Sequence, residues 1–293
     1  MRRYQVSRQF KRIYNLTIEP TDGPSRVIRE LRVNFEITKS GLSFPNLCKL
    51  TIYNPNQDTL SALQKKFTKI IFNAGYEGDL GLLFSGEVRN ITQAKHGVDR
   101  LITIYAGDGE KDWQNSMINK TFAKNVTIKS AIEEVIKSFT NTGTGEIIGL
   151  PDTADKLRGQ TLSGSSKDIL DGFAEEYGFG WSIQDGDIVI TPDNSPLVGD
   201  EAVLINSATG MIGSPILTEI GADVSALLNH RLLPNRAFII ESVNAEIQLG
   251  NLFFRDIKKT SAEGLYKIQE VVFKGDSREG DWSSSLKGIT LNG

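Results

Sequence analysis

The chain has very few of the side chains that carry redox, acid–base or metal chemistry. Among its 293 residues there are one cysteine and two histidines. The single thiol, Cys48, cannot form an internal disulfide, which fits assembly in a reducing cytoplasm. It shares an alternating face with Leu50 and Ile52, so we expect it in the core. His96 and His230 have no cysteine or histidine partner at ligand spacing, which argues against a zinc site and favours histidines packed in or near turns.

Sequence motifs of the common catalytic classes are also missing. No Gly-x-Ser-x-Gly pentad marks a serine nucleophile, and the serines of 162–168 are better explained as loop residues and helix N-caps. The Gly-rich run at 141–145 lacks the Lys-Ser/Thr of a phosphate loop and ends a helix, where that motif must open one. We therefore expect no catalytic, cofactor-binding or metal-binding residues and no enzyme activity.

Long apolar runs and an excess of basic residues are absent as well. No window approaches the roughly 18 to 20 apolar residues that span a bilayer, and the basic start lacks the apolar stretch of a signal peptide, so we expect no membrane contact. Lys and Arg number 33 against 36 Asp and Glu, for a net charge of -3, which disfavours nucleic-acid binding as the main role. Five N-terminal residues form a local basic run, which we interpret as a solvated end in preference to an arm for an acidic protein surface: Arg2, Arg3, Arg8, Lys11 and Arg12.

Carboxylates and tryptophans leave one enzymatic alternative open. A glycosidase needs only two carboxylates at the right separation, which sequence spacing does not report. Asp108, Glu110 and Asp112 alternate as calcium ligands can, but the run lacks the glycine and terminal Glu of an EF-hand loop, which favours a solvated turn. Three tryptophans could stack on sugars, although each lies at the edge of an element, where core packing is favoured: Trp113, Trp181 and Trp282.

The first 110 residues have the period-2 pattern of strands with one buried face. Leu31, Val33, Phe35 and Ile37 alternate with polar residues. A helix is indicated where three apolar residues have helical spacing: Leu60, Leu63 and Phe67. Further strands are expected at 48–54, 68–76, 82–93 and 99–109. So many short strands favour a closed or nearly closed antiparallel barrel, which would hide the strand edges.

The middle of the chain changes period. One amphipathic helix starts at Thr127 or Ser130 and stops at 141–145, with four residues on its apolar face: Ile132, Val135, Ile136 and Phe139. A second starts near Ser165 or Ser166 and ends at Gly178, again with four apolar residues on one face: Ile169, Leu170, Phe173 and Tyr177. The Asp185-Gly186 pair then predicts a tight hairpin between Trp181-Ile183 and Ile188-Ile190.

Strands return after a Pro-containing linker at 191–201. The segment 237–247 carries Phe238, Ile240 and Val243, while 264–276 is a long strand candidate with one apolar face: Tyr266, Ile268 and Val272. A terminal strand is expected at 284–291. The predicted fold is mainly β with a smaller α+β part: an N-terminal β-barrel domain (1–110), an α+β domain (111–195) and a C-terminal β-barrel domain (196–293).

The order and spacing of these segments resemble one protein family. FKRIYNLTIEP, LRVNFEITKS and PNLCKLTIYN, followed by FSGEVRNI and DRLITIYAGDG, are similar to the opening of the baseplate hub proteins of contractile-tailed bacteriophages. GMIGSPILTE, LLNHRLLPNRAFIIES and the final YKIQEVVFKGDSREGDWSSSLKGI look like the closing domain of that family. No single motif is diagnostic, and the succession of all of them carries the resemblance.

The resemblance implies a structural role in a phage tail. It implies two tube-like barrels per chain, so that a homotrimeric ring presents six and joins the sixfold tail tube to the threefold central spike. The implied partners are other copies of the chain, the tail spike protein and the tail tube or distal tube protein, with tape measure and baseplate wedge proteins as further candidates. The implied location is the baseplate of a virion that is assembled in the host cytoplasm, with DNA only in transit through the lumen and no cofactor.

Two other functions stay open on the sequence. One is a phage-associated carbohydrate-binding or cell-wall-degrading protein that uses exposed tryptophans and a carboxylate pair. The other is a β-barrel nucleic-acid binder, which the acidic balance of the chain makes the weaker of the two.

Overall fold

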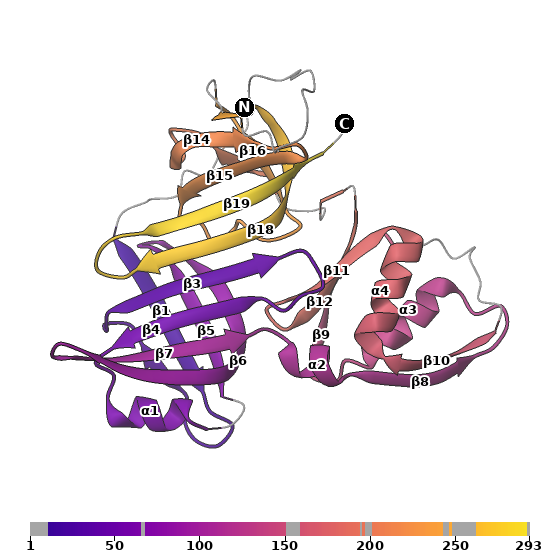
Figure 1. Cartoon of the computed structure of the whole chain (residues 1–293), viewed down its shortest axis with the longest axis horizontal. Coiled ribbons are helices and arrows are strands. Elements are labelled where there is room, and N and C mark those ends of the chain that lie inside the picture. The colour runs from indigo at the N-terminus through magenta and orange to yellow at the C-terminus, as the bar shows by residue number, and fades with distance from the viewer. Residues whose placement is uncertain are drawn as a thin grey trace.

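The computed structural model describes residues 11–65, 68–150, 159–193, 195–196, 201–242, 246–247 and 262–291. Three parts follow each other along the chain: a first β unit (11–107), an α+β unit (110–192) and a second β unit (203–290). The two β units lie one above the other, and the α+β unit projects from one side of them (Figure 1).

The first β unit follows the alternation of the sequence. In β3 (Val33–Ser40), Val33, Phe35 and Ile37 are buried, as predicted, and Cys48 is buried in β4 (Leu47–Tyr53). The predicted helix is confirmed as α1 (Gln57–Leu63), which Asn56 caps, while Phe67 lies outside the described residues. The other strands of this unit are β1 (Arg12–Glu19), β2 (Arg26–Ile28), β5 (Lys69–Tyr76), β6 (Asp79–His96) and β7 (Asp99–Gly107).

Both predicted helices of the α+β unit are confirmed. Thr127 caps α3 (Ile128–Lys137) by accepting a hydrogen bond from the backbone of Ser130, and the left-handed Gly178 ends α4 (Ser166–Tyr177). The predicted hairpin is β11 (Phe179–Gln184) and β12 (Asp187–Pro192), and both residues of its turn have positive φ. The remaining elements are α2 (Glu110–Asn115), β8 (Met117–Phe122), β9 (Gly143–Ile147) and β10 (Gln160–Ser165).

Three of these strands, β8, β9 and β10, were not indicated by the sequence. Ser163 was expected in a loop, but it lies in β10, which pairs antiparallel with β8, while Ser165 at the end of β10 is the N-cap of α4, as expected. Residues 143–145 were expected only as a helix stop, yet they begin β9, which pairs parallel with β12. Strands β9 and β10 are polar and Gly-rich, so pairing with a distant segment decides their conformation and local propensity does not.

The second β unit contains seven strands, which include the predicted segments around 238, 270 and 287. They are β13 (Val203–Ile205), β14 (Met211–Leu217), β15 (Gly221–Leu227), β16 (Ala237–Ile240), β17 (Glu246–Ile247), β18 (Gly264–Asp276) and β19 (Trp282–Thr290). Phe238 and Ile240 are buried, as expected from their alternation, and Val243 lies outside the described residues.

Among the described strands, one antiparallel pairing connects the two β units. One edge of β18 pairs first with β16, through residues 264–267, and then with β3, through residues 270–276. Its other edge pairs with β19 along most of its length. As a result, one 14-stranded sheet runs through both units (Figure 1). Twelve of its strands follow each other in the order β17-β14-β15-β19-β18-β3-β4-β7-β6-β5-β1-β2, and the other two, β16 and β13, branch off at β18.

A β-bulge in the middle of β18 corrects one prediction. Pairing with β19 shifts by one residue between Ile268 and Glu270, so the side chains beyond the bulge change faces. Tyr266 and Ile268 are buried before the bulge, while Val271 and Phe273 are buried after it. The expectation that Val272 shares the face of Tyr266 and Ile268 was therefore wrong, because uninterrupted period-2 alternation was assumed.

The described residues form two hydrophobic cores. One runs through both β units without a break, and the other lies between the helices and strands of the α+β unit. At the joint of the β units, Phe35 of β3 meets the edge of the Trp282 ring of β19 at a centroid distance of 5.3 Å. The two β units are thus packed as one body.

The bulge makes a prediction about neighbouring residues of β18. Phe273→Ala should lower the free energy of unfolding by about 3–5 kcal/mol, because it opens a cavity in the shared core. Val272→Ala, on the opposite face, should cost less than about 1 kcal/mol. Urea denaturation measures both values. Equal losses for the two variants would contradict the assigned faces.

Candidate functional site

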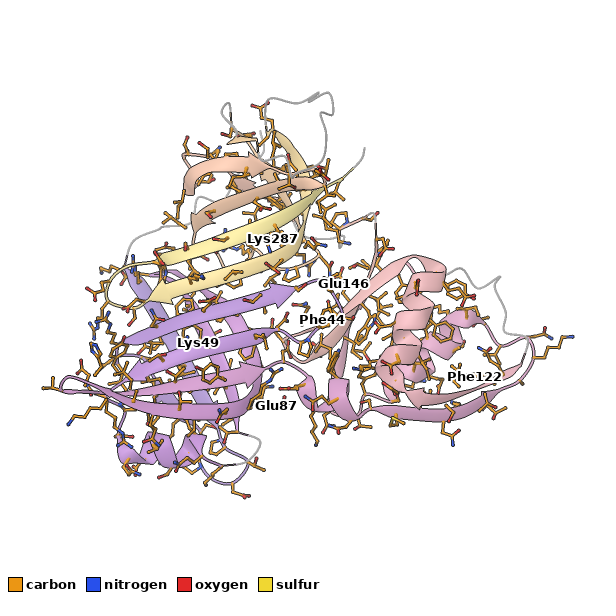
Figure 2. All side chains as sticks on the ribbon, viewed as in Figure 1. Phe44, Lys49, Glu87, Phe122, Glu146 and Lys287 are labelled. Atoms are coloured by element: carbon orange, nitrogen blue, oxygen red, sulfur yellow. The ribbon has the colours of Figure 1, made fainter. Side chains whose placement is uncertain are left out.

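The solvent side of six neighbouring strands forms a continuous surface. These strands, in spatial order, are β15, β19, β18, β3, β4 and β7, and we call their solvent side the open face. Side chains on the opposite side of the same strands form the core. Lys49 on the first β unit and Lys287 on the second mark this surface in Figure 2.

Charges on the open face are arranged in rows across the strands. In one row, Lys274, Glu36 and Lys49 are successive cross-strand neighbours. In another, Asp223, Lys287 and Glu270 follow each other in the same way. Lys274 Nζ lies 3.5 Å from Glu36 Oε1, and Lys287 Nζ lies 2.8 Å from Glu270 Oε1.

Hydroxyl groups occupy much of the surface between these rows. Thr51 and Thr103 share a hydrogen bond of 2.9 Å between β4 and β7, and Ser225 and Ser285 share one of 3.1 Å between β15 and β19. Each lysine of the rows has an acidic cross-strand neighbour, so no cluster of one sign develops. The charges of the open face therefore compensate locally, and the exposed side chains of Leu47 and Tyr105 add an apolar part to this face.

Two buried lysines anchor the β11–β12 hairpin to the β units. Lys39 continues the core-facing alternation of β3, and its Nζ lies 2.6 Å from Oδ2 of Asp185 in the hairpin turn. Lys267 of β18 donates a 2.9 Å hydrogen bond to the carbonyl of Pro192 at the end of the hairpin. Burial lowers the pKa of Lys267. The hairpin is thus held at one end by each β unit, and we call these four residues the hairpin clamp.

A second polar cluster lies beside Asp185. Asn46 Nδ2 donates to the carbonyl of Ile183 at 2.9 Å and to Asp108 Oδ2 at 3.3 Å, and the backbone N–H of Asp185 donates to the same carboxylate oxygen. Gln184 Nε2 donates a 2.7 Å hydrogen bond to the carbonyl of Ser40. These contacts join the α+β unit to the end of the first β sheet.

Asp108 is fully buried in this cluster. Burial raises the pKa of its carboxyl group to about 7, and the negative charge of Asp185 adds to the increase. Its Oδ1 atom has no hydrogen-bond partner among the described residues. Glu87 of β6 also has an unpaired buried oxygen, and burial raises its pKa.

The expectation of a solvated turn at 108–112 was wrong. Asp108 and Asp112 are buried, and Asp112 accepts hydrogen bonds from the backbone of Asn141 and from the Thr142 hydroxyl group at 2.8 Å. Helix α2 begins here against β11, so closely that a Cβ on Gly109 would lie 2.6 Å from Cγ2 of Ile183. The sequence shows only alternating acids and glycines, because the burying elements are contributed by residues far along the chain.

The histidines and tryptophans that the sequence analysis considered as candidate site residues lie mostly in structural positions. His96 ends β6 next to the predicted hairpin turn, and His230 packs beside β6, 3.9 Å from Asp79. Trp181 and Trp282 are buried, and the Trp113 indole donates to the carbonyl of Ser43 at 2.6 Å.

The basic N-terminal run is only partly described, since Arg2, Arg3 and Arg8 lie outside the described residues. Lys11 pairs with the exposed Glu77 at 2.8 Å, which fits a solvated end. Arg12 is exposed as well, and it also donates to the carbonyl of Gly280 at 2.8 Å and lies over the ring of Trp282. It holds β1 against the β18–β19 turn.

Of the two acids in this cluster, Asp108 is buried and the side chain of Asp185 is 20% exposed. The largest cavity described, of about 730 Å³, is lined by residues of β1 and of the β18–β19 turn, such as Tyr14 and Arg278. Neither Asp108 nor Asp185 lines any of the three cavities described. In the described ranges there is also no group of three side chains that could hold a metal ion.

A family model described as baseplate hub gp41 matches residues 13–244 of the chain. No curated protein sequence matches with significance. Within the described residues, no helix combines the length and apolar character needed to cross a membrane.

Solved structures with the same fold include three proteins of phage tails and secretion systems. The 43 kDa tail protein of prophage MuSo2 from Shewanella oneidensis superposes with a TM-score of 0.63 at 10% identity, covering 94% of this chain and 97% of that one. A tail protein from Neisseria meningitidis gives 0.61 at 9% identity, with coverages of 94% and 96%. A type VI secretion component of E. coli, itself similar to the T4 tail proteins gp27 and gp5, gives 0.61 at 10%, with coverages of 94% and 77%.

The burial of Asp108 makes the junction sensitive to pH. Its pKa is raised from 3.8 to about 7 in the folded chain, so the folded state binds the proton more tightly and stability falls as the pH rises between these values. Asp108→Asn should remove this contribution and reduce the fall between pH 4.5 and 8 by roughly 3 kcal/mol. Denaturant unfolding at several pH values measures it. Parallel pH profiles for variant and parent would contradict the assignment.

Proposed function

This chain belongs to the baseplate hub gp41 family, and on that premise we propose that three copies form the ring that joins the sixfold tail tube to the threefold central spike of a contractile phage. Membership of this family supports a structural role in a phage baseplate. The trimeric ring, its contacts with the tail tube and the spike, and its central channel for DNA are what we propose.

The open face is the observation that carries this proposal. It runs without a break from the second β unit to the first, because β18 pairs with β3. If each β unit is a tube-like barrel, three chains place six such units around one axis. A ring of identical chains uses heterologous contacts that close on themselves. In that ring the open face forms the wall of the channel.

The charge pattern of the open face suits a channel that DNA crosses without sticking. Proteins bind DNA strongly when Lys and Arg side chains neutralise phosphates and release counterions. On the open face Lys274, Lys49 and Lys287 each have an acidic cross-strand neighbour. A passing phosphate therefore meets no cluster of free cations.

The remaining partners follow from the same arrangement. The spike protein and the tube or distal tube protein would bind at the two ends of the ring, and the tape measure and baseplate wedge proteins are further candidates. The α+β unit projects beside the β units, where it can contact surrounding baseplate proteins (Figure 1). On this proposal the chain is not an enzyme, needs no cofactor, and acts in the virion after assembly in the host cytoplasm.

The ring predicts a defined mass in solution. Multi-angle light scattering of the purified chain across a concentration series should show a species of three 32.3 kDa subunits. If the ring forms only on its spike, the same species should appear when the spike protein is added. A chain that stays monomeric under both conditions would contradict the trimer.

The open face also predicts a gain of DNA binding on charge reversal. Glu36→Lys together with Glu270→Lys leaves several lysines without acidic neighbours, so retention on double-stranded DNA should rise at least about tenfold at low salt and fall as salt is added. Glu175→Lys with Glu176→Lys on α4 is the matched control, because the change in charge is the same and both residues are exposed away from the open face. Filter binding compares the variants. Equal retention by both pairs, or strong binding by the parent, would argue against the channel.

A further inference from the structure

A cleft of about 730 Å³ lies between the first β unit and the β18–β19 turn, and the proposed ring does not use it. It is lined by the start of β1, the loop 29–31, Leu80 of β6, and Ser277 and Arg278 of the turn. Clefts of this volume are typical of ligand sites. The cleft is therefore large enough to hold a few residues of another protein.

One side of the cleft is an apolar cross-strand row. Ile13 of β1 is opposite Gly75 of β5, which is opposite Leu80 of β6. Because Gly75 has no side chain, it covers neither of the two aliphatic side chains. Leu80 is 42% exposed, and Ile13 is partly exposed. An apolar side chain that packs on this row removes both from water, which favours binding.

Positive charge surrounds the apolar row. The cleft is lined by Arg12, Arg29 and Arg278, against the single carboxylate of Glu30. Within the described ranges, none of these three arginines forms an ion pair with an acidic side chain. Guanidinium groups bind carboxylates through paired, charge-assisted hydrogen bonds. A ligand with carboxylates would therefore compensate the charge of the cleft.

Backbone carbonyls hold the basic rim in place. Tyr14 donates its hydroxyl hydrogen to the carbonyl of Leu31, and Arg278 donates to the carbonyl of Glu30 at 2.6 Å. The loop that carries Arg29 is thus held from two sides. Carbonyl groups are neutral acceptors, so these contacts fix the rim without cancelling its charge. A preformed rim lowers the entropy cost of binding.

The acidic residues of the β18–β19 turn are directed elsewhere. Asp276 and Glu279 pair with Arg32 at 2.9 and 2.6 Å, and with Asp281 they line a separate cavity. The ten residues before Lys11 carry three arginines and no acidic residue, so that segment has the same sign of charge as the cleft. The complementary charge is therefore expected from another molecule.

The cleft and the open face lie on opposite walls of the first β unit. Phe35 of β3 and Phe72 of β5 meet across the core with ring centroids 4.9 Å apart, so β3 and β5 belong to opposite walls. Strand β1 pairs with β5, and Ile13 alternates with the buried Tyr14, so Ile13 points away from the core on that wall. Figure 1 shows β1 and β5 behind β3 and β4. In the proposed ring the cleft faces away from the channel.

From these observations we propose that the cleft binds an acidic segment of another protein, whose carboxylates contact the arginines of the rim and whose apolar side chain packs between Ile13 and Leu80. Nucleic acid fits this cleft less well, because bases stack on exposed aromatic rings and the ring of Tyr14 is buried. The cleft is built within one chain, so the inference does not rest on the proposed ring.

Fluorescence anisotropy with a labelled peptide tests the cleft in the full-length chain. The probe has six glutamates around one leucine and one phenylalanine. Two matched peptides, with lysines for the glutamates or with serines for the two apolar residues, should bind at least about tenfold more weakly. Arg29→Glu and Leu80→Glu should each raise the Kd of the probe at least about tenfold. Lys129→Glu on α3 is the control, because it makes the same change of charge at an exposed position in the α+β unit.

Each outcome decides for or against the peptide site. No binding of the probe by the parent, or equal binding by the parent and both cleft variants, would overturn it. An eight-nucleotide single strand of DNA that binds more tightly than the probe would assign the cleft to nucleic acid and also overturn it. Urea midpoints of both variants should match the parent, because Arg29 and Leu80 are exposed, which separates loss of binding from loss of folding. The mass of the ring is measured independently of all these results.

Discussion

The architecture depends on the way β18 divides its hydrogen bonds between the two β units. Its first residues pair with β16, its last with β3, and the bulge at Gln269 separates the two pairings. Without the bulge, period-2 alternation would direct Glu270 to the core side that Tyr266 and Ile268 occupy. Because the bulge changes the face of every later residue, Val271 and Phe273 fill the common core and Glu270 reaches the solvent.

The same strand helps to position the α+β unit. Lys267 precedes the bulge and reaches the end of the β11–β12 hairpin, while Lys39 of β3 reaches its turn. Removing one member of a buried ion pair leaves an uncompensated charge at a cost of about 3–5 kcal/mol, although the intact pair contributes little net stability. The hairpin clamp therefore acts mainly on orientation. It couples the projecting unit to both β units.

In the proposed ring the functional surface is the open face of the sheet, where one cavity of about 170 Å³ is lined by residues such as Asp223, Glu270 and Lys287. Its strands present hydroxyl groups and paired charges over both β units, and their opposite sides form the core. Cross-strand pairing that stabilises the sheet also neutralises the surface. One arrangement of residues thus serves the stability of the fold and, in the proposed ring, the passage of DNA.

The sequence by itself determined the local elements. Alternation in β3, the cap at Thr127, the left-handed Gly178 and the Asp185-Gly186 turn are encoded within a few neighbouring residues, and each of them was predicted. The resemblance in segment order indicated the family. Only the tertiary structure decided the joint of β18 with β3, the bulge at Gln269 and the burial of Asp108. The joint and the burial of Asp108 depend on contacts between residues more than 70 positions apart, such as Asp108 with Asp185, and the bulge depends on the pairing of β18 with β19. Local periodicity carries no information about such pairs. A strand has the same alternation whichever strand it pairs with. An acidic residue next to glycine has the sequence pattern of an exposed turn, and only contacts with a distant element bury it.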